Sequence, residues 1–320
     1  MATSNSFNFS VNRDVLIKDA LIDIGAIAQE DTPSSPIIEH AARQLNLMLK
    51  AWQSKGLRMW KSRNATLLLQ KDTQSYSIGF TGDHFFLDSE LVETEMRVAA
   101  IATDTIMEVD STTGMAASDN IGVELDDGSM HFTTISSVTD SNTLVLASAI
   151  PAGDAVAIDN NIYTYTTKAQ RPLQIIEARI RDDTNFDRPV KIISREEYLQ
   201  YSDKATSGSI VSIYYDPQLT NGTLYVYAPE SETVNTLKMV VQYPFEDMDA
   251  TANDFDFPQE WLMAVKCNLS LVLAPSYGVQ GTQLKTIAAL ADGYLDEAMG
   301  FDKENNTSIL LQPEQNWSDV

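Results

Sequence analysis

The feature that most constrains the fold is the segment from Phe257 to Gly278, FPQEWLMAVKCNLSLVLAPSYG. At 100° per residue, Trp261, Val265 and Leu269 share one broad apolar stripe, and further apolar residues cover much of the remaining surface. A helix of this kind is either central in a large core or packed between its own subunit and the next one. Because few other helices are predicted, we expect a subunit interface at these three residues. The alternative is that they pack on the first two helices of their own chain.

Two helices are predicted near the N-terminus. Asn12 is a suitable N-cap for a helix over about residues 13–24, which Gly25 ends. Pro36 occupies a first-turn position of a second helix, whose apolar residues recur at three- and four-residue spacing until Gly56. In the last third, Pro258 opens another helix, and TQLKTIAALADGYLDEAMG predicts one that ends near residue 300.

Strand patterns fill the middle of the chain. The runs ATLLLQ and SYSIGF flank the polar KDTQ and predict a β-hairpin over Ala65–Phe80. Further strands are predicted at LQIIEARIRD and TLKMVVQYP, and a hairpin across TNG joins IVSIYY to TLYVYA. Ser194 and Glu197 have the spacing of a capping box, which opens a short helix.

Residues 98–167 differ sharply in composition from their surroundings. They hold ten acidic residues and neither Lys nor Arg. Short apolar runs alternate with STTG, DDG, DSN and PAGD at intervals of about ten residues, a pattern typical of a small antiparallel β-barrel or sandwich. We therefore expect an inserted β domain over 98–167. An adaptor-like body over 1–97 and 168–300 and a C-terminal arm over 301–320 complete the predicted organisation, which is α+β.

Charge and cysteine content narrow the function classes. The chain carries 45 acidic residues against 22 Lys plus Arg, a net charge of −23, which opposes binding to phosphate backbones. Its single cysteine, Cys267, excludes an intrachain disulfide framework and a Cys-based zinc site. The first 28 residues lack a basic region before an apolar core, and no apolar run reaches membrane-spanning length. We expect a soluble chain with no membrane partner.

The sequence carries no recognisable catalytic or ligand-binding motif. His40, His84 and His131 lack metal-ligand spacing, and DGSMHFTT lacks the nucleophile turn of a hydrolase. The acidic loops lack the spaced ligands of a helix–loop–helix calcium site, and GVQGTQLKT matches no phosphate or dinucleotide motif. We therefore expect no catalytic residue, no cofactor and no metal, and a protein that is not an enzyme.

The C-terminal segment FDKENNTSILLQPEQNWSDV is polar apart from a few apolar residues and cannot build a core alone. We expect it to be an arm that orders on a partner. Aliphatic and aromatic anchors dominate interface energies. The predicted anchors are Ile309, Leu310, Leu311 and Trp317.

Several segments together resemble the head-to-tail adaptors of tailed bacteriophages, in particular the tail accessory factors, or packaged-DNA stabilisation proteins, of short-tailed phages. They are LIKDALIDIGAIA, LNLMLKAWQSKGLRMW, YYDPQLTNGTLYVYAPES and FPQEWLMAVKCNLSLVLAPSYG, in that order. The inserted GMAASDNIGVELDDGSMHFTTI is similar to a module found in many of these adaptors. The resemblance covers about 250 residues, and residues 301–320 match only loosely.

The resemblance implies a virion structural protein at the head–tail junction, assembled in the host cytoplasm. Such a connector forms a homo-oligomeric ring, commonly a dodecamer of about twelve subunits with closed cyclic symmetry. It binds the portal protein, extends the DNA channel, retains packaged DNA and offers the platform for tail assembly and nozzle proteins. DNA is expected to pass the lumen without specific binding. The alternative is a virion-associated protein that degrades peptidoglycan or binds carbohydrate, the latter through a face at FTTI and YTYT of the β domain.

Overall fold

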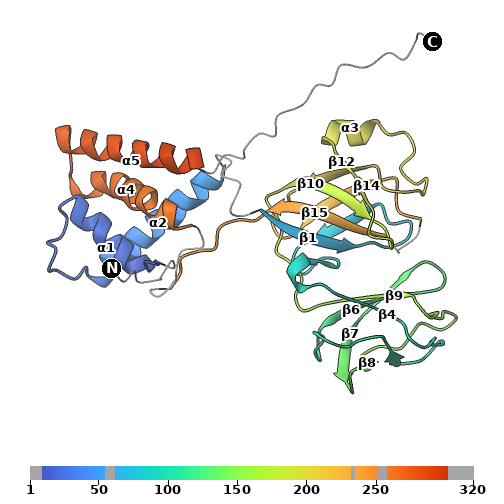
Figure 1. Cartoon of the computed structure of the whole chain (residues 1–320). Coiled ribbons are helices and arrows are strands. Elements are labelled where there is room, and N and C mark those ends of the chain that lie inside the picture. The colour runs from blue at the N-terminus through green and yellow to red at the C-terminus, as the bar shows by residue number, and fades with distance from the viewer. Residues whose placement is uncertain (1–8, 55–61, 232–234, 251–257, 302–320) are drawn as a thin grey trace, which may run out of the picture. The chain divides into compact units, whose positions relative to one another are not determined.

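The computed structural model describes residues 9–54, 62–231, 235–250 and 258–301, and is a mixed α+β protein with a β-rich body, as predicted (Figure 1). The chain divides into two compact units. A helical unit combines residues 1–61 with 245–320, and a β unit holds residues 62–244. The described N-terminal helices and C-terminal helices therefore belong to one unit.

In its described residues, the helical unit has four α-helices around one apolar core. They are α1 (Arg13–Asp23), α2 (Ser35–Ser54), α4 (Leu262–Leu273) and α5 (Gly281–Phe301). Short 3-10 turns, Gln259–Trp261 and Ala274–Tyr277, flank α4. α4 packs against all three other helices, so it is the central element of this unit.

The local signals at the helix ends are confirmed. The Asn12 side chain accepts a hydrogen bond from the backbone N–H of Val15, which satisfies one of the free donors at the start of α1. Gly25 has a φ of 72°, a left-handed conformation that ends a helix at little cost in glycine. The predicted boundaries of α1 follow from these two residues.

Two sheets enclose the main core of the β unit. One has the order β11-β10-β15-β1-β3 and the other β12-β13-β14-β2. The bounds are β1 Ser62–Leu68, β2 Ser75–Ile78, β3 Phe85–Leu87, β10 Gln174–Arg181, β11 Asp187–Pro189, β12 Lys191–Ile192, β13 Ser212–Asp216, β14 Gly222–Tyr227 and β15 Thr236–Gln242. Buried side chains such as Leu67, Ile213, Leu224 and Leu237 fill this core.

The predicted hairpin over Ala65–Phe80 is wrong. β1 pairs with β15 and β3 in the five-stranded sheet, whereas β2 pairs with β14 in the other sheet. Residues 65–68 are all buried, so this end of β1 is covered on both faces of the sheet. It also has a partner strand on each side, β15 and β3. Two apolar runs joined by a polar linker have the same sequence pattern whether the two strands pair within one sheet or belong to two different sheets. The predicted β10, β15 and β13–β14 hairpin are confirmed.

Six further strands form a third, antiparallel sheet that curls into a small barrel. They are β4 (Val92–Glu95), β5 (Ile106–Glu108), β6 (Asn120–Glu124), β7 (Met130–Val138), β8 (Thr143–Leu146) and β9 (Asn161–Tyr165), in the order β4-β9-β6-β7-β8-β5. The chain just beyond β4 meets the chain at β5, since Arg97 N donates to Glu108 O at 2.9 Å and Asp110 N to Glu95 O at 3.0 Å. A separate apolar cluster fills this layer. The predicted limits of 98–167 therefore omit β4.

An aromatic seam joins the barrel to the rest of the β unit. Leu68 and Phe86 of the five-stranded sheet pack against Met130, Tyr163 and Tyr165 of the barrel. The rings of Phe86 and Tyr165 stack with centroids 3.9 Å apart and an interplanar angle of 10°. The YTYT motif, predicted to be a possible binding face, is thus mostly interior.

Candidate functional site

The three residues predicted at a subunit interface lie inside the helical unit. Trp261 and Val265 are each 1% exposed and Leu269 is 0% exposed. Trp261 meets Trp52 of α2 with ring centroids 6.0 Å apart. This is the alternative placement, packing on the chain's own first helices, and it leaves these side chains no surface for a second chain. The three other helices of the unit suffice to cover most of α4, an arrangement that the sequence alone did not indicate.

One surface that the helical unit leaves uncovered is a groove between α4 and α5, called here the α4–α5 groove. Its volume is about 350 Å³. Apolar side chains form much of its lining, with Met263 44% exposed and Leu290 50% exposed, beside Ile287 and Tyr294. Gln283 and Thr286 of α5 provide a polar wall. A connected apolar surface of this kind is typical of a binding groove.

The remaining wall of the groove is polar but internally satisfied. Lys266 Nζ lies 3.0 Å from Asp23 Oδ2, and although burial opposes it, this partner raises the Lys266 pKa. Ser270 Oγ donates to backbone carbonyls, with Lys266 O at 2.9 Å. Burial raises the pKa of the Cys267 thiol, which keeps it protonated and a poor nucleophile. The groove is therefore suited to binding an apolar segment and not to covalent chemistry.

A buried amide holds the two groove helices together. Asn268 is 8% exposed, and its Nδ2 donates to Ala264 O at 2.9 Å within α4 and to Ala291 O at 3.0 Å in α5. A buried amide with satisfied donors fixes a single arrangement of the elements that it joins. The groove is a preformed feature of the helical unit.

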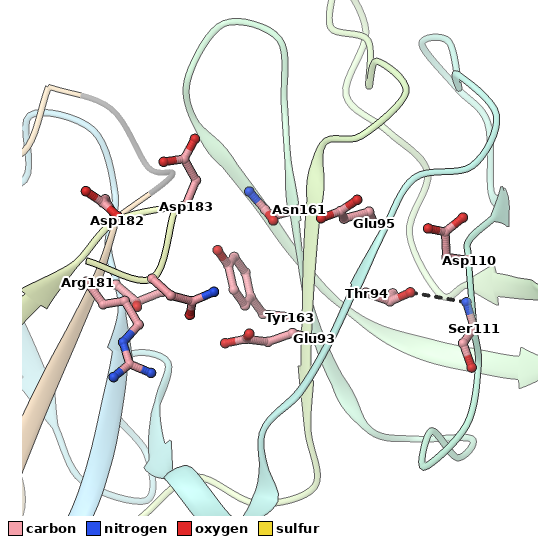
Figure 2. A pocket seen from close by; sticks show the side chains of 12 residues that line it. Glu93, Thr94, Glu95, Asp110, Ser111, Asn161, Tyr163, Arg181, Asp182 and Asp183 are labelled. Carbon is pink, nitrogen blue, oxygen red and sulfur yellow. Dashed lines mark hydrogen bonds between the residues drawn. The ribbon is translucent and has the colours of Figure 1, made fainter. Parts of the chain in front are cut away.

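The β unit carries a cavity of a different character, of about 400 Å³, between β4 and β9 of the barrel and the turn after β10 (Figure 2). Carboxylates dominate its lining: Glu93, Glu95, Asp110, Asp182 and Asp183, with the single cation Arg181. Within the described residues, no three His, Cys, Asp or Glu side chains are arranged to hold a metal ion. This cavity repels anions such as nucleic-acid phosphates.

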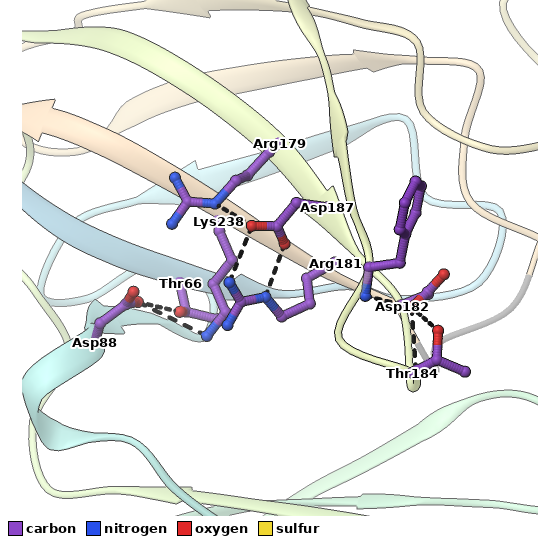
Figure 3. Close-up of polar contacts among 9 residues, drawn as sticks. Thr66, Asp88, Arg179, Arg181, Asp182, Thr184, Asp187 and Lys238 are labelled. Carbon is purple, nitrogen blue, oxygen red and sulfur yellow. Dashed lines mark hydrogen bonds and ion pairs between the residues drawn. The ribbon is translucent and has the colours of Figure 1, made fainter.

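A charged cluster on the five-stranded sheet shares Arg181 with this cavity (Figure 3). Lys238 of β15 is 3% exposed, and burial lowers its pKa against the opposing effect of Asp88, whose carboxylate is 3.9 Å away. Asp88 also accepts a hydrogen bond from the Thr66 hydroxyl. Beside them, the hydrogen bond from Arg181 lowers the pKa of Asp187. Lys238 and Asp88 are each other's partners, so we interpret the cluster as having a structural role.

Sequence reasoning missed a cluster of tyrosines on the four-stranded sheet. α3 (Arg195–Gln200) begins with the predicted capping box of Ser194 and Glu197 and brings two tyrosines over the sheet. The cluster comprises Tyr198, Tyr201, Tyr214, Tyr225 and Tyr227. Tyr201 and Tyr227 stack at 3.8 Å, and Lys204 Nζ lies 5.4 Å from the Tyr198 ring centroid. The period of two in TLYVY puts Tyr225 and Tyr227 on one face, which is the signal that could have revealed it.

The histidines have packing roles. His84 stacks on Phe132 with centroids 3.5 Å apart, and its Nδ1 shares a hydrogen bond of 2.6 Å with the Tyr165 hydroxyl. Burial, aided by the nearby charge of Lys168, lowers the pKa of His84 to about 4. His131 of β7 contacts a backbone carbonyl, and His40 lies on α2. None of the three joins a described metal group.

The predicted arm anchors Ile309, Leu310, Leu311 and Trp317 lie outside the described residues. Among the helices that the structure describes, none has both the length and the apolar character to span a lipid bilayer. No protein-family model matches the sequence, and no curated protein matches it significantly. The site therefore has to be interpreted from its own geometry.

Proposed function

We propose that this chain is a structural head-to-tail connector of a tailed bacteriophage. In this proposal about twelve copies form a closed ring under the portal protein, extend the DNA channel, retain packaged DNA and provide the platform for tail proteins. The subunit performs no catalysis and needs no cofactor. It acts in the virion at the head–tail junction after assembly in the host cytoplasm.

The observation that carries the proposal is the helical unit. Its helices come from the N-terminal and the C-terminal parts of the chain, and it presents the preformed, apolar α4–α5 groove on its surface. The segments that resemble phage adaptors include α1, α2 and α4, which together build this unit. A rigid helical unit with an apolar groove is a suitable scaffold for contacts with other chains.

Charge supports the part of the proposal that concerns DNA. The net charge is −23, and the cavity beside β4 adds a local concentration of carboxylates. Phosphate backbones bind where Lys and Arg release counterions, and an acidic wall has the opposite effect. DNA that leaves the capsid through such a ring would not adhere to it.

The direct test mixes the purified full-length chain with the portal ring of the same virus and images the mixture by electron microscopy. The expected result is a second ring of matching symmetry on one end of the portal. Leu310→Ser with Leu311→Ser should weaken this complex, because apolar anchors carry much of the binding energy. The matched control is Gln312→Ser with Gln315→Ser. A portal that remains bare at micromolar concentrations of both proteins would refute the proposal.

The tyrosine cluster favours a second candidate, carbohydrate binding, at a different place from the FTTI and YTYT face. Aromatic side chains present large, rigid contact surfaces with a polar hydroxyl at the edge. Tyr201 and Tyr227 are both partly exposed. A glycan array should then show binding that Tyr227→Ala abolishes and Tyr76→Phe, at a buried tyrosine of β2, does not. Silence on the array removes this candidate.

A further inference from the structure

The α4–α5 groove needs an occupant. Met263 and Leu290 expose about half of their apolar surface there, and no described segment covers them. We propose that, in the free chain, the apolar triplet Ile309–Leu311 of the same chain folds back into this groove. The proposal concerns the isolated subunit and holds whether or not the chain is a connector.

The chemistry of the groove fits this segment. The triplet is aliphatic and is bounded by polar residues, Asn305 to Ser308 before it and Gln312 after it. The groove offers Met263, Ile287, Leu290 and Tyr294 as an apolar lining, and Gln283 and Thr286 as a polar wall. The one cation of the lining, Lys266, is paired with Asp23, so an aliphatic occupant would bury no unpaired charge there.

The chain is long enough to make the return. Leu290 lies eleven residues before Phe301, the last residue of α5, which corresponds to about 17 Å along the helix axis. Residues 302–308 can span at most about 23 Å when extended. Ile309 can therefore reach the middle of the groove from the end of its own helix.

The short connection also selects the chain's own segment over that of a neighbouring copy. A segment joined by a short flexible linker experiences an effective concentration of about millimolar. A second copy of the chain at micromolar concentration cannot compete on equal terms for the same groove. The intramolecular contact is therefore expected to prevail in dilute solution.

The test places a thiol on the polar wall and measures how fast it reacts. In a Cys267→Ala background, Gln283→Cys introduces the only thiol of the chain at a position that lines the groove but adds nothing to its apolar lining. The reaction of the full-length protein with a small aromatic disulfide reagent is followed at micromolar concentration. Adding Leu310→Ser and Leu311→Ser should accelerate this reaction about tenfold, equivalent to about 1.4 kcal/mol of docking free energy.

Two matched controls separate docking from general loosening of the helical unit. Gln312→Ser with Gln315→Ser changes the same segment without touching the triplet and should leave the rate unchanged. The second control places the thiol at Ala289→Cys, which is also exposed on α5 but lies outside the groove lining. This thiol should react at the same rate whether residues 310 and 311 are leucine or serine. Equal rates for the introduced thiol at position 283 with and without the triplet would overturn the proposal.

Concentration dependence identifies the occupant. Protection by the chain's own segment is independent of protein concentration, whereas protection that grows with concentration would mean that a neighbouring copy fills the groove and would also overturn the proposal. Portal binding does not enter this readout. A chain that fails to bind a portal but shows the tenfold effect would defeat the connector function and leave the fold-back contact intact.

Discussion

The helical unit and the β unit bury their apolar residues in different ways. In the helical unit, α4 is packed against three helices, and two of the exposed apolar residues, Met263 and Leu290, line the α4–α5 groove. In the β unit, the barrel strands curl until β4 and β5 meet, and its exposed Ile101 and Ile106 line none of the described cavities. The cavity of the β unit shown in Figure 2 has five carboxylates and one cation in its polar lining. The difference is one of lining: the helical unit offers an apolar groove, whereas the cavity of the β unit in Figure 2 is acidic.

The largest effect is expected from the core of the helical unit. Trp261→Ala removes a large side chain that is 1% exposed, and should destabilise this unit by about 4 kcal/mol through the cavity it leaves. Leu237→Ala, at a 0% exposed position of β15, should destabilise the β unit by about 3 kcal/mol. Chemical denaturation followed by circular dichroism should show each variant shifting a different transition. A single transition that both variants shift together would contradict the separation of the two units.

The next largest effect is expected at the charged pair of Lys238 and Asp88 in the β unit. Asp88→Ala leaves Lys238 buried without its carboxylate and the Thr66 hydroxyl without its acceptor, which should cost the β unit about 2–3 kcal/mol. Lys238→Met removes the buried charge itself and should change the stability by less than about 1 kcal/mol. Urea denaturation of both variants makes the comparison. If Lys238→Met were as damaging as Asp88→Ala, the pair would contribute net stability and the cluster would need another explanation.

Local sequence signals predicted the elements well, and the reason is that each depends on a few neighbouring residues. Asn12, Gly25 and the capping box at Ser194 specify helix ends through their own backbone and side-chain geometry. The β13–β14 hairpin follows from a short turn between two alternating runs. The barrel follows from turn residues at regular spacing within 98–167.

Partners distant in sequence could not be predicted in the same way. β1 shows the same pattern whether its partner is β2 or β15, and only the packed sheet decides between them. The apolar surface of α4 identified a helix with several buried faces, but not that α5 would cover one of them through Asn268. The groove and the tyrosine cluster arise from such distant pairings, so the sequence showed their residues without their arrangement.

The stability of the β unit should also depend on pH, because His84 is half-buried against Phe132 and Tyr165 of the barrel. The pKa of His84 is about 4 in the folded protein, compared with 6.5 in the unfolded chain, because burial disfavours its charged form. Between pH 6.5 and 4 the unfolded chain binds more protons, so this residue lowers stability as the pH falls through that window. His84→Gln should reduce the loss by about 1–2 kcal/mol at pH 4, after allowance for its partial exposure. If the stability of His84→Gln fell with pH as steeply as that of the parent protein, burial of His84 would not be the source of this dependence.

The smallest effects compare the two helix caps. Asn12→Ala removes the acceptor for Val15 N and should lower the stability of the helical unit by about 1 kcal/mol, since α1 packs on α4 and cannot fray without losing that contact. Ser194→Ala breaks the capping box of α3, but this helix has only six residues and can fray locally, so the β unit should lose only about 0.5 kcal/mol. Hydrogen exchange should show faster exchange confined to α3 for Ser194→Ala, and spread over α1 and α4 for Asn12→Ala. Exchange that stays local in both variants would mean that α1 is less tightly coupled to the central helix than its packing indicates.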